Sequence, residues 1–133
     1  MIKLFIGGKG SGKTKTLIEL VNNAVSASKG NVVCIEKGDK LIHDITYKAR
    51  LIDTDYYSVA DAGALYGFIA GILASNTDIT DIFVDSALKI CANDALAFEA
   101  MLPKLEKITK DVNLVMTASI PVDECPDGIK AYA

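Results

Sequence analysis

Short apolar runs alternate with longer amphipathic segments along this sequence, and the alternation limits the fold more than any other feature. The runs Ile2–Ile6, Asn31–Ile35 and Ile79–Val84 have the length and β-branched content of buried strands. A fourth run, Asn113–Ser119, ends just before Pro121. Strands separated by helices of about 15 residues predict βαβ crossovers. We therefore expect an α/β fold, with a mostly parallel central sheet between two helical layers.

Helical periodicity fills the gaps between these runs. Lys13–Ser28 is expected to be a helix with Gly30 as its C-terminal cap, and its apolar face comprises Leu17, Leu20, Val21, Ala24 and Val25. Ser58 and Asp61 resemble a capping box that opens a second helix ending near Ser75. Its glycines recur every four residues, at positions 63, 67 and 71, and are expected to lie against the sheet.

The remaining segments are less regular. Asn93 or Asp94 is expected to cap a third helix, which Pro103 should kink or divide. The inward-facing positions of this helix are predicted to be Leu96, Met101, Leu105 and Ile108. One or two further strands are expected between residues 40 and 57, with Ala49–Asp53 the best candidate.

Composition excludes several classes of protein. The 133 residues suit a single domain, residues 1–133, and the 50% apolar content argues against disorder. A net charge of −3 and a single arginine, Arg50, argue against direct nucleic-acid binding. One histidine and three scattered cysteines disfavour a zinc-type site and indicate reduced thiols in a cytoplasmic protein. The apolar stretch Ala62–Ala74 is shorter than the roughly 20 residues of a membrane span, so no membrane association is expected.

The first predicted strand ends in Gly7-Gly8-Lys9-Gly10-Ser11-Gly12-Lys13-Thr14, which fits the pattern GxxxxGK[ST] in full. Glycines let backbone N–H groups curve around an anion, and the start of the following helix adds its positive end. A flexible glycine-rich turn would require neither the lysine nor the fixed interval. The motif therefore predicts a phosphate cradle in which Lys13 reaches the β- and γ-phosphates and Thr14 ligates Mg²⁺.

Two acidic residues are candidates for the rest of such a site. Asp85 follows the apolar run Ile82-Phe83-Val84, where a carboxylate at the end of a buried parallel strand could bind Mg²⁺. An ordinary helix-capping Asp would give the same pattern. Ser86 follows Asp85 and cannot act as a base, so Glu36, at the end of the second run, is the candidate for activating water. This role assumes that its strand lies beside the phosphate-loop strand. The alternative is an exposed strand-end Glu without a role.

Taken together, these segments resemble the RecA-like P-loop ATPases over about residues 1–120. The resemblance implies Glu36 as the catalytic glutamate and a polar residue near Thr117 or Ser119 that senses the γ-phosphate. The DNA-binding loops of RecA proteins have no counterpart here, and Arg50, the only candidate arginine finger, matches no motif. The nucleotide-binding residues are then Gly7, Gly8, Lys9, Gly10, Ser11, Gly12, Lys13, Thr14 and Thr16, with Lys13 and Glu36 catalytic and Thr14 and Asp85 on the metal.

The function expected from this resemblance is Mg²⁺-dependent ATP binding, with ATP hydrolysis as the reaction and ATP and ADP as partners. A nucleotide-binding switch or scaffold without turnover is the main alternative. A small-molecule kinase fits less well, because it would need arginines and a lid around the transferred phosphoryl group. Association with a second copy or another protein is left open.

Overall fold

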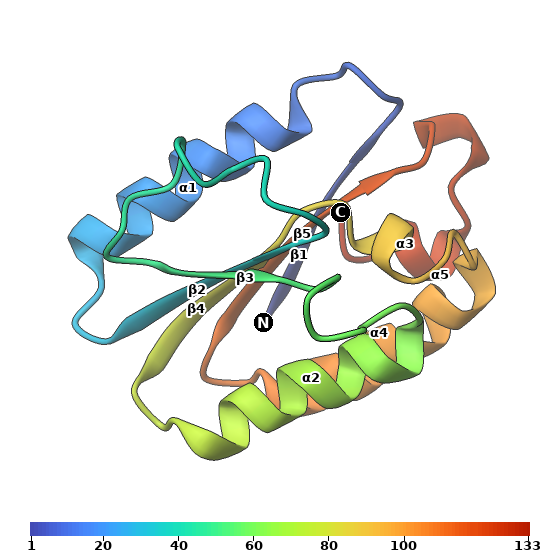
Figure 1. Ribbon diagram of the computed structural model, residues 1–133. Helices are drawn as coiled ribbons and strands as arrows, with labels where there is room; N and C mark the ends of the chain where they lie inside the picture. The colour runs from blue at the N-terminus through green and yellow to red at the C-terminus, as the bar shows by residue number, and fades with distance from the viewer.

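Five parallel strands form one sheet at the centre of the molecule (Figure 1). The computed structural model describes residues 1–133. The strands, in chain order, are β1 (Ile2–Gly7), β2 (Asn31–Glu36), β3 (Arg50–Asp53), β4 (Ile79–Val84) and β5 (Asn113–Ser119). Their order across the sheet is β1-β5-β4-β2-β3, and every neighbouring pair is parallel. The expected α/β architecture with a parallel sheet between helices is thereby confirmed.

One face of the sheet is covered by α1 (Lys13–Ala27) and by the loop that follows β2 (Figure 1). Leu17 and Val21 of α1 are fully buried, as the helical periodicity predicts. They belong to a hydrophobic cluster that also contains Leu41, Ile45 and Ala49 of the loop. Residues 40–48 therefore form turns that cover this face, and the segment contributes one strand, β3, at the position of the best candidate, Ala49–Asp53.

The opposite face carries the larger hydrophobic cluster, which comprises 26 buried residues. Its helices are α2 (Ala62–Ser75), α3 (Ala87–Ile90), α4 (Ala95–Ile108) and α5 (Asp127–Lys130), with a short 3₁₀ turn at Val122–Glu124. Asp94 caps α4 through a hydrogen bond from Ala97 N to its carboxylate. The helices on both faces give the three layers that were expected from the sequence.

The start of α2 differs from the expectation. Asp61 is its N-terminal cap and accepts a hydrogen bond from Ala64 N at 2.7 Å, whereas Ser58 lies three residues before the cap in a left-handed turn. The glycine face was also wrong: Gly63, Gly67 and Gly71 are exposed, and Leu65 and Ile69 point to the core. Burial of the larger aliphatic side chains on the sheet outweighs the closer approach that glycines would allow.

Three local predictions on the other helices are corrected. α4 continues through Pro103 as one helix, so the proline does not divide it. Leu96 is 80% exposed, and Phe98 and Leu102 fill the core in its place. Gly30 does not cap α1, because the helix ends at Ser28; a Cβ at position 30 would lie 2.0 Å from the Asp78 carbonyl oxygen. This glycine permits a close approach of two backbones.

No helix of the protein combines the length and the apolar character that a bilayer crossing requires. The three cysteines, Cys34, Cys91 and Cys125, are buried and form no disulfide. Burial raises the pKa of the Cys34 thiol to about 12, and the carboxylates of Glu36 and Asp85 add to the shift. A thiol with so high a pKa carries almost no reactive thiolate at neutral pH.

Candidate functional site

The glycine-rich loop between β1 and α1 lies at the carboxyl end of the sheet. Gly10 and Gly12 have φ of 80° and 83°, in the left-handed region that glycine adopts at little cost. Gly12 is also the N-terminal cap of α1, so the loop passes directly into the first turn of the helix. This geometry turns backbone N–H groups and the positive end of the helix toward one concave surface.

Lys13 folds back over this loop. Its Nζ atom donates hydrogen bonds to the carbonyl oxygen of Gly8 at 2.8 Å and to Ser11 Oγ at 3.1 Å. The ammonium group is thus held beside the loop backbone, where an anion bound in the cradle would meet it. Thr16, in contrast, donates its hydroxyl to the carbonyl oxygen of Gly12 at 3.1 Å and is thereby engaged within the first turn of α1.

Asp85 follows β4 and faces the start of α1. Thr14 Oγ1 donates to its two carboxylate oxygens at 3.2 and 3.3 Å. Thr117, on the neighbouring strand β5, donates to Asp85 Oδ1 at 2.7 Å and accepts a hydrogen bond from Ser86 N at the same distance. Asp85 is 8% exposed. The two hydroxyls therefore fix the orientation of a nearly buried carboxylate.

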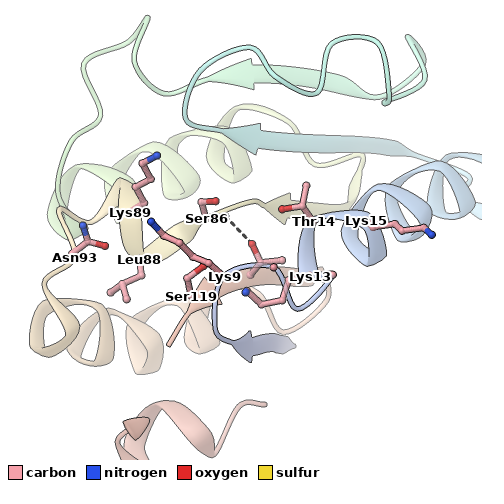
Figure 2. A pocket seen from close by; sticks show the side chains of 12 residues that line it. Lys9, Lys13, Thr14, Lys15, Ser86, Leu88, Lys89, Asn93 and Ser119 are labelled. Atoms are coloured by element: carbon pink, nitrogen blue, oxygen red, sulfur yellow. Dashed lines mark hydrogen bonds between the residues drawn. The ribbon is translucent and has the colours of Figure 1, made fainter. Parts of the chain in front are cut away.

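A pocket of about 550 Å³ lies next to these groups (Figure 2). It is bounded by the glycine-rich loop and α1, by the turn and helix after β4, and by the end of β5. The lining residues are Lys9, Gly10, Gly12, Lys13, Thr14, Lys15, Ser86, Leu88, Lys89, Asn93, Thr117 and Ser119. Only one of these side chains is hydrophobic, which makes the pocket suited to a polar or charged ligand.

The pocket gathers some of the sequence-predicted residues and omits others. The predicted residues that line it are Lys9, Gly10, Gly12, Lys13 and Thr14. Thr14 also donates a hydrogen bond to Asp85. The predicted residues that do not line it are Gly7, Gly8, Ser11, Thr16, Glu36 and Asp85. Gly8 and Ser11 still take part, because they accept the hydrogen bonds of the Lys13 ammonium.

Glu36 ends β2, but β2 does not lie beside β1 as was assumed: β5 and β4 stand between them. Its carboxylate is 3% exposed and accepts a hydrogen bond from Leu41 N at 3.1 Å. Burial raises the pKa of this carboxyl group, and the carboxylates of Asp85 and Asp53 add to the shift, while hydrogen bonds from the Leu41 and Lys40 backbone oppose it. Glu36 is thus a buried acid beside the Asp85 strand, not an exposed strand end.

The donor set fits a hard divalent cation that arrives with a ligand. No group of three or more His, Cys, Asp or Glu side chains gathers to hold a metal by itself. Thr14 and Asp85 place one hydroxyl and one carboxylate within hydrogen-bonding distance of each other. Mg²⁺ is commonly bound by one or two such protein oxygens, with water and phosphate oxygens completing its octahedron. The residues present therefore fit Mg²⁺ bound together with a phosphate ester.

Five pocket residues outside the motif were not among the sequence candidates: Lys15, Ser86, Leu88, Lys89 and Asn93. Lys15 directly follows the motif, and this position could have identified it as a pocket residue from the sequence. Lys89 reaches the pocket from α3, and Asn93 reaches it from the turn that follows. Arg50 begins the edge strand β3, at the end of the sheet opposite to the phosphate loop, and does not line the pocket.

Comparison with known proteins adds no family assignment to this geometry. No protein-family model matches the chain, and no curated protein matches it significantly.

Proposed function

We propose that this protein is a Mg²⁺-dependent ATP-binding protein of the P-loop NTPase type, related to the RecA-like ATPases. The observation that carries the proposal is the pairing of the complete phosphate loop with Asp85 through Thr14. Residues 71 positions apart in the chain meet where the motif requires a metal-binding hydroxyl and carboxylate. A glycine-rich turn with only a structural role would not need this meeting.

Phosphate binding follows from the chain's own groups. The loop amides and the N-terminus of α1 hold an anion, and Lys13 adds a charge-assisted hydrogen bond. Mg²⁺, when bound, would neutralise phosphate charge from the side of Thr14 and Asp85. Thr117 keeps the Asp85 carboxylate turned toward Thr14 by its 2.7 Å hydrogen bond.

Hydrolysis of the bound nucleotide is the reaction we propose, with Glu36 as the residue that accepts a proton from water. Support comes from the position of Glu36 at the carboxyl end of β2, next to β4, and from burial that raises its pKa. A raised pKa makes a carboxylate a better general base near neutral pH. Glu36 is 3% exposed and does not line the pocket, so water must reach a buried carboxylate and slow turnover by the isolated chain is expected.

A nucleotide-binding switch or scaffold without turnover is the second candidate. It is favoured by the pocket lining, which contains no carboxylate. Phosphate release from Mg²⁺–ATP separates the two functions. Under the hydrolysis proposal the wild type releases phosphate, and Glu36→Gln lowers the rate by about 10²- to 10⁴-fold with nucleotide affinity unchanged. Binding without release, at high protein concentration, assigns the switch or scaffold function.

The test of nucleotide binding itself is calorimetric titration with Mg²⁺–ADP and with the non-hydrolysable β,γ-imido analogue of ATP. Wild type should bind both, and Lys13→Ala should bind neither measurably. Lys48→Ala, at an exposed lysine far from the motif in sequence, is the matched control and should bind as the wild type does. No binding of either ligand by the wild type would contradict the proposal.

A further inference from the structure

The wall of the pocket that faces the phosphate loop is formed by α3 and the turn that follows it (Figure 2). Three of the four residues of α3, Ala87, Leu88 and Ile90, are buried. Lys89 is the exposed member, and it lines the pocket. The packing of its neighbours therefore fixes the side of the helix from which the Lys89 side chain leaves.

The backbone on both sides of Lys89 is held in an unusual conformation. Ser86, Ala92 and Asn93 are non-glycine residues with φ of 56°, 58° and 57°. Hydrogen bonds maintain these turns: Ser86 N donates to Thr117 Oγ1 at 2.7 Å, and Asn93 N donates to the Leu88 carbonyl oxygen at 2.9 Å. Left-handed non-glycine residues cost free energy and persist where the surrounding structure fixes them. The wall is thus preorganised.

The pocket also concentrates positive charge without neutralising it. Four lysines line it (Figure 2): the phosphate loop and α1 contribute Lys9, Lys13 and Lys15, and the opposite wall contributes Lys89. None of the four is in a salt bridge, because the single salt bridge of the protein joins Lys37 and Asp55. The pocket lining contains no acidic side chain, although the whole chain has a net charge of −3. Such a pocket suits a ligand with several negative charges.

We propose that Lys89 binds the terminal phosphate of a nucleoside triphosphate, so that the pocket prefers triphosphates to diphosphates; this inference rests on the nucleotide-binding function proposed above. The loop backbone accounts for the inner phosphates, and Lys13 reaches the terminal phosphate from the loop side only. Thr14 and Asp85 mark the metal side, and the α3 wall begins directly after Asp85 at Ser86. A third phosphate continuing away from the loop would meet this wall, where Lys89 is the cation that the wall itself supplies; Lys9 reaches toward the same region from the loop (Figure 2).

Lys89 would then take the place of the arginine that neutralises the terminal phosphate in many P-loop NTPases. The only arginine of this chain, Arg50, lies at the amino end of β3, away from the pocket. The role assigned to Lys89 is that of a specificity-determining residue. It predicts an effect on triphosphate affinity that a merely structural lysine would not produce.

The experiment compares the dissociation constants of Mg²⁺–ADP and of the Mg²⁺ complex of the β,γ-imido ATP analogue, measured by calorimetry. In Lys89→Ala the affinity for the analogue should fall by about 10- to 100-fold, the range of a charge-assisted hydrogen bond. Affinity for ADP should stay within about twofold. Lys89→Arg retains the charge and should keep most of the preference for triphosphate. Lys107→Ala is the matched control, because Lys107 is likewise an exposed lysine in the last turn of a helix.

The outcomes distinguish the role of Lys89 from nucleotide binding itself. A selective loss of analogue affinity in Lys89→Ala, absent in Lys107→Ala, supports the assignment. Wild-type binding of both ligands with an unchanged ADP-to-analogue ratio in Lys89→Ala overturns the role of Lys89 and leaves nucleotide binding intact. An equal loss for both ligands overturns it as well. Failure of the wild type to bind either ligand overturns the nucleotide-binding function itself.

Discussion

Thr117 donates its hydroxyl to the Asp85 carboxylate at 2.7 Å across the boundary between β5 and β4. The same hydroxyl oxygen accepts from Ser86 N, so one side chain fixes both the carboxylate and the turn that begins the α3 wall. Thr117 is 2% exposed, which means that no solvent replaces these bonds if the hydroxyl is lost. β5, which lies between β1 and β4, therefore also orients the Asp85 carboxylate through Thr117.

Thr117→Val should lower the free energy of unfolding by about 1–3 kcal/mol, because the methyl group leaves the Asp85 carboxylate and Ser86 N–H short of a buried partner. Urea denaturation measures the change. Thr77→Val, at an exposed threonine with no side-chain hydrogen bond, should stay within about 0.5 kcal/mol of the wild type. Equal effects of the two substitutions would show that the Thr117 hydroxyl contributes nothing specific.

Lys13→Ala should abolish stabilisation by nucleotide. A ligand at about 100 times its dissociation constant adds roughly 2.7 kcal/mol to the stability of the wild type. For a domain of this size the gain corresponds to a rise in melting temperature of about 5–10 °C. Thermal unfolding with and without Mg²⁺–ADP measures it, and Lys48→Ala should retain the full rise. A rise that persists in Lys13→Ala would contradict the role of the phosphate loop.

Asp85→Asn should reduce the dependence of nucleotide binding on Mg²⁺. Asparagine keeps an oxygen that can accept the Thr117 hydroxyl, so the fold is expected to survive. It lacks the negative charge that Mg²⁺ prefers. Titrations with ADP in Mg²⁺ and in EDTA should differ less for the variant than for the wild type. An unchanged difference would place the metal elsewhere.

Glu36 should give the stability of the protein a distinct pH dependence. Burial raises its pKa above the ordinary value of 4.5, so the folded state binds this proton more tightly than the unfolded state does. Stability contributed by Glu36 is therefore fully present below pH 4.5 and is lost as pH rises through the folded-state pKa.

Glu36→Gln removes this titration and keeps an oxygen for the Leu41 N–H. Between pH 4.5 and pH 7 the wild type should lose more stability than Glu36→Gln does, as measured by urea denaturation at each pH. Glu19→Gln, an exposed position on α1, should follow the wild-type profile. Parallel profiles for wild type and Glu36→Gln would argue against a raised pKa.

Gly30→Ala and Gly67→Ala should have opposite effects. A Cβ at position 30 would lie 2.0 Å from the Asp78 carbonyl oxygen, so the two backbones must separate and the protein should lose more than about 2 kcal/mol. A Cβ at position 67 would meet no other part of the protein within 4 Å, and the position lies inside α2, where alanine stabilises a helix by about 0.5–1 kcal/mol relative to glycine. A shared sign in denaturation would contradict this account of the two glycines.

Local signals account for what could be predicted from the sequence. The phosphate loop is contiguous, and its motif specifies both the turn and the start of α1. Asp85 follows an apolar strand that is buried on both faces, which periodicity identifies well. The direction of the glycine face of α2 was not predictable in this way, because α2 is apolar around most of its circumference and periodicity could not distinguish its two sides.

The features that could not be predicted from the sequence depend on contacts between residues far apart in the chain. The position of Glu36 depends on the order of strands across the sheet, and chain order does not give that order. Lys89 reaches the pocket because its three helical neighbours are buried and the following turn is left-handed, neither of which leaves a motif. Thr117 was expected near the phosphates, but its bonds to Asp85 and Ser86 follow from strand register.

The position of β5 in the sheet determines when the site can be completed during folding. It is the last of the five strands to be synthesised, yet it lies between β1, which leads into the phosphate loop, and β4, which leads to Asp85. Until it enters, a gap of roughly 10 Å, two strand spacings, separates the strands on either side. A nascent chain that has released only the residues up to α4 carries every residue of the glycine-rich loop but lacks the strand that lies between β1 and β4. Under the proposed function, we therefore expect nucleotide binding to begin only after β5 has joined the sheet.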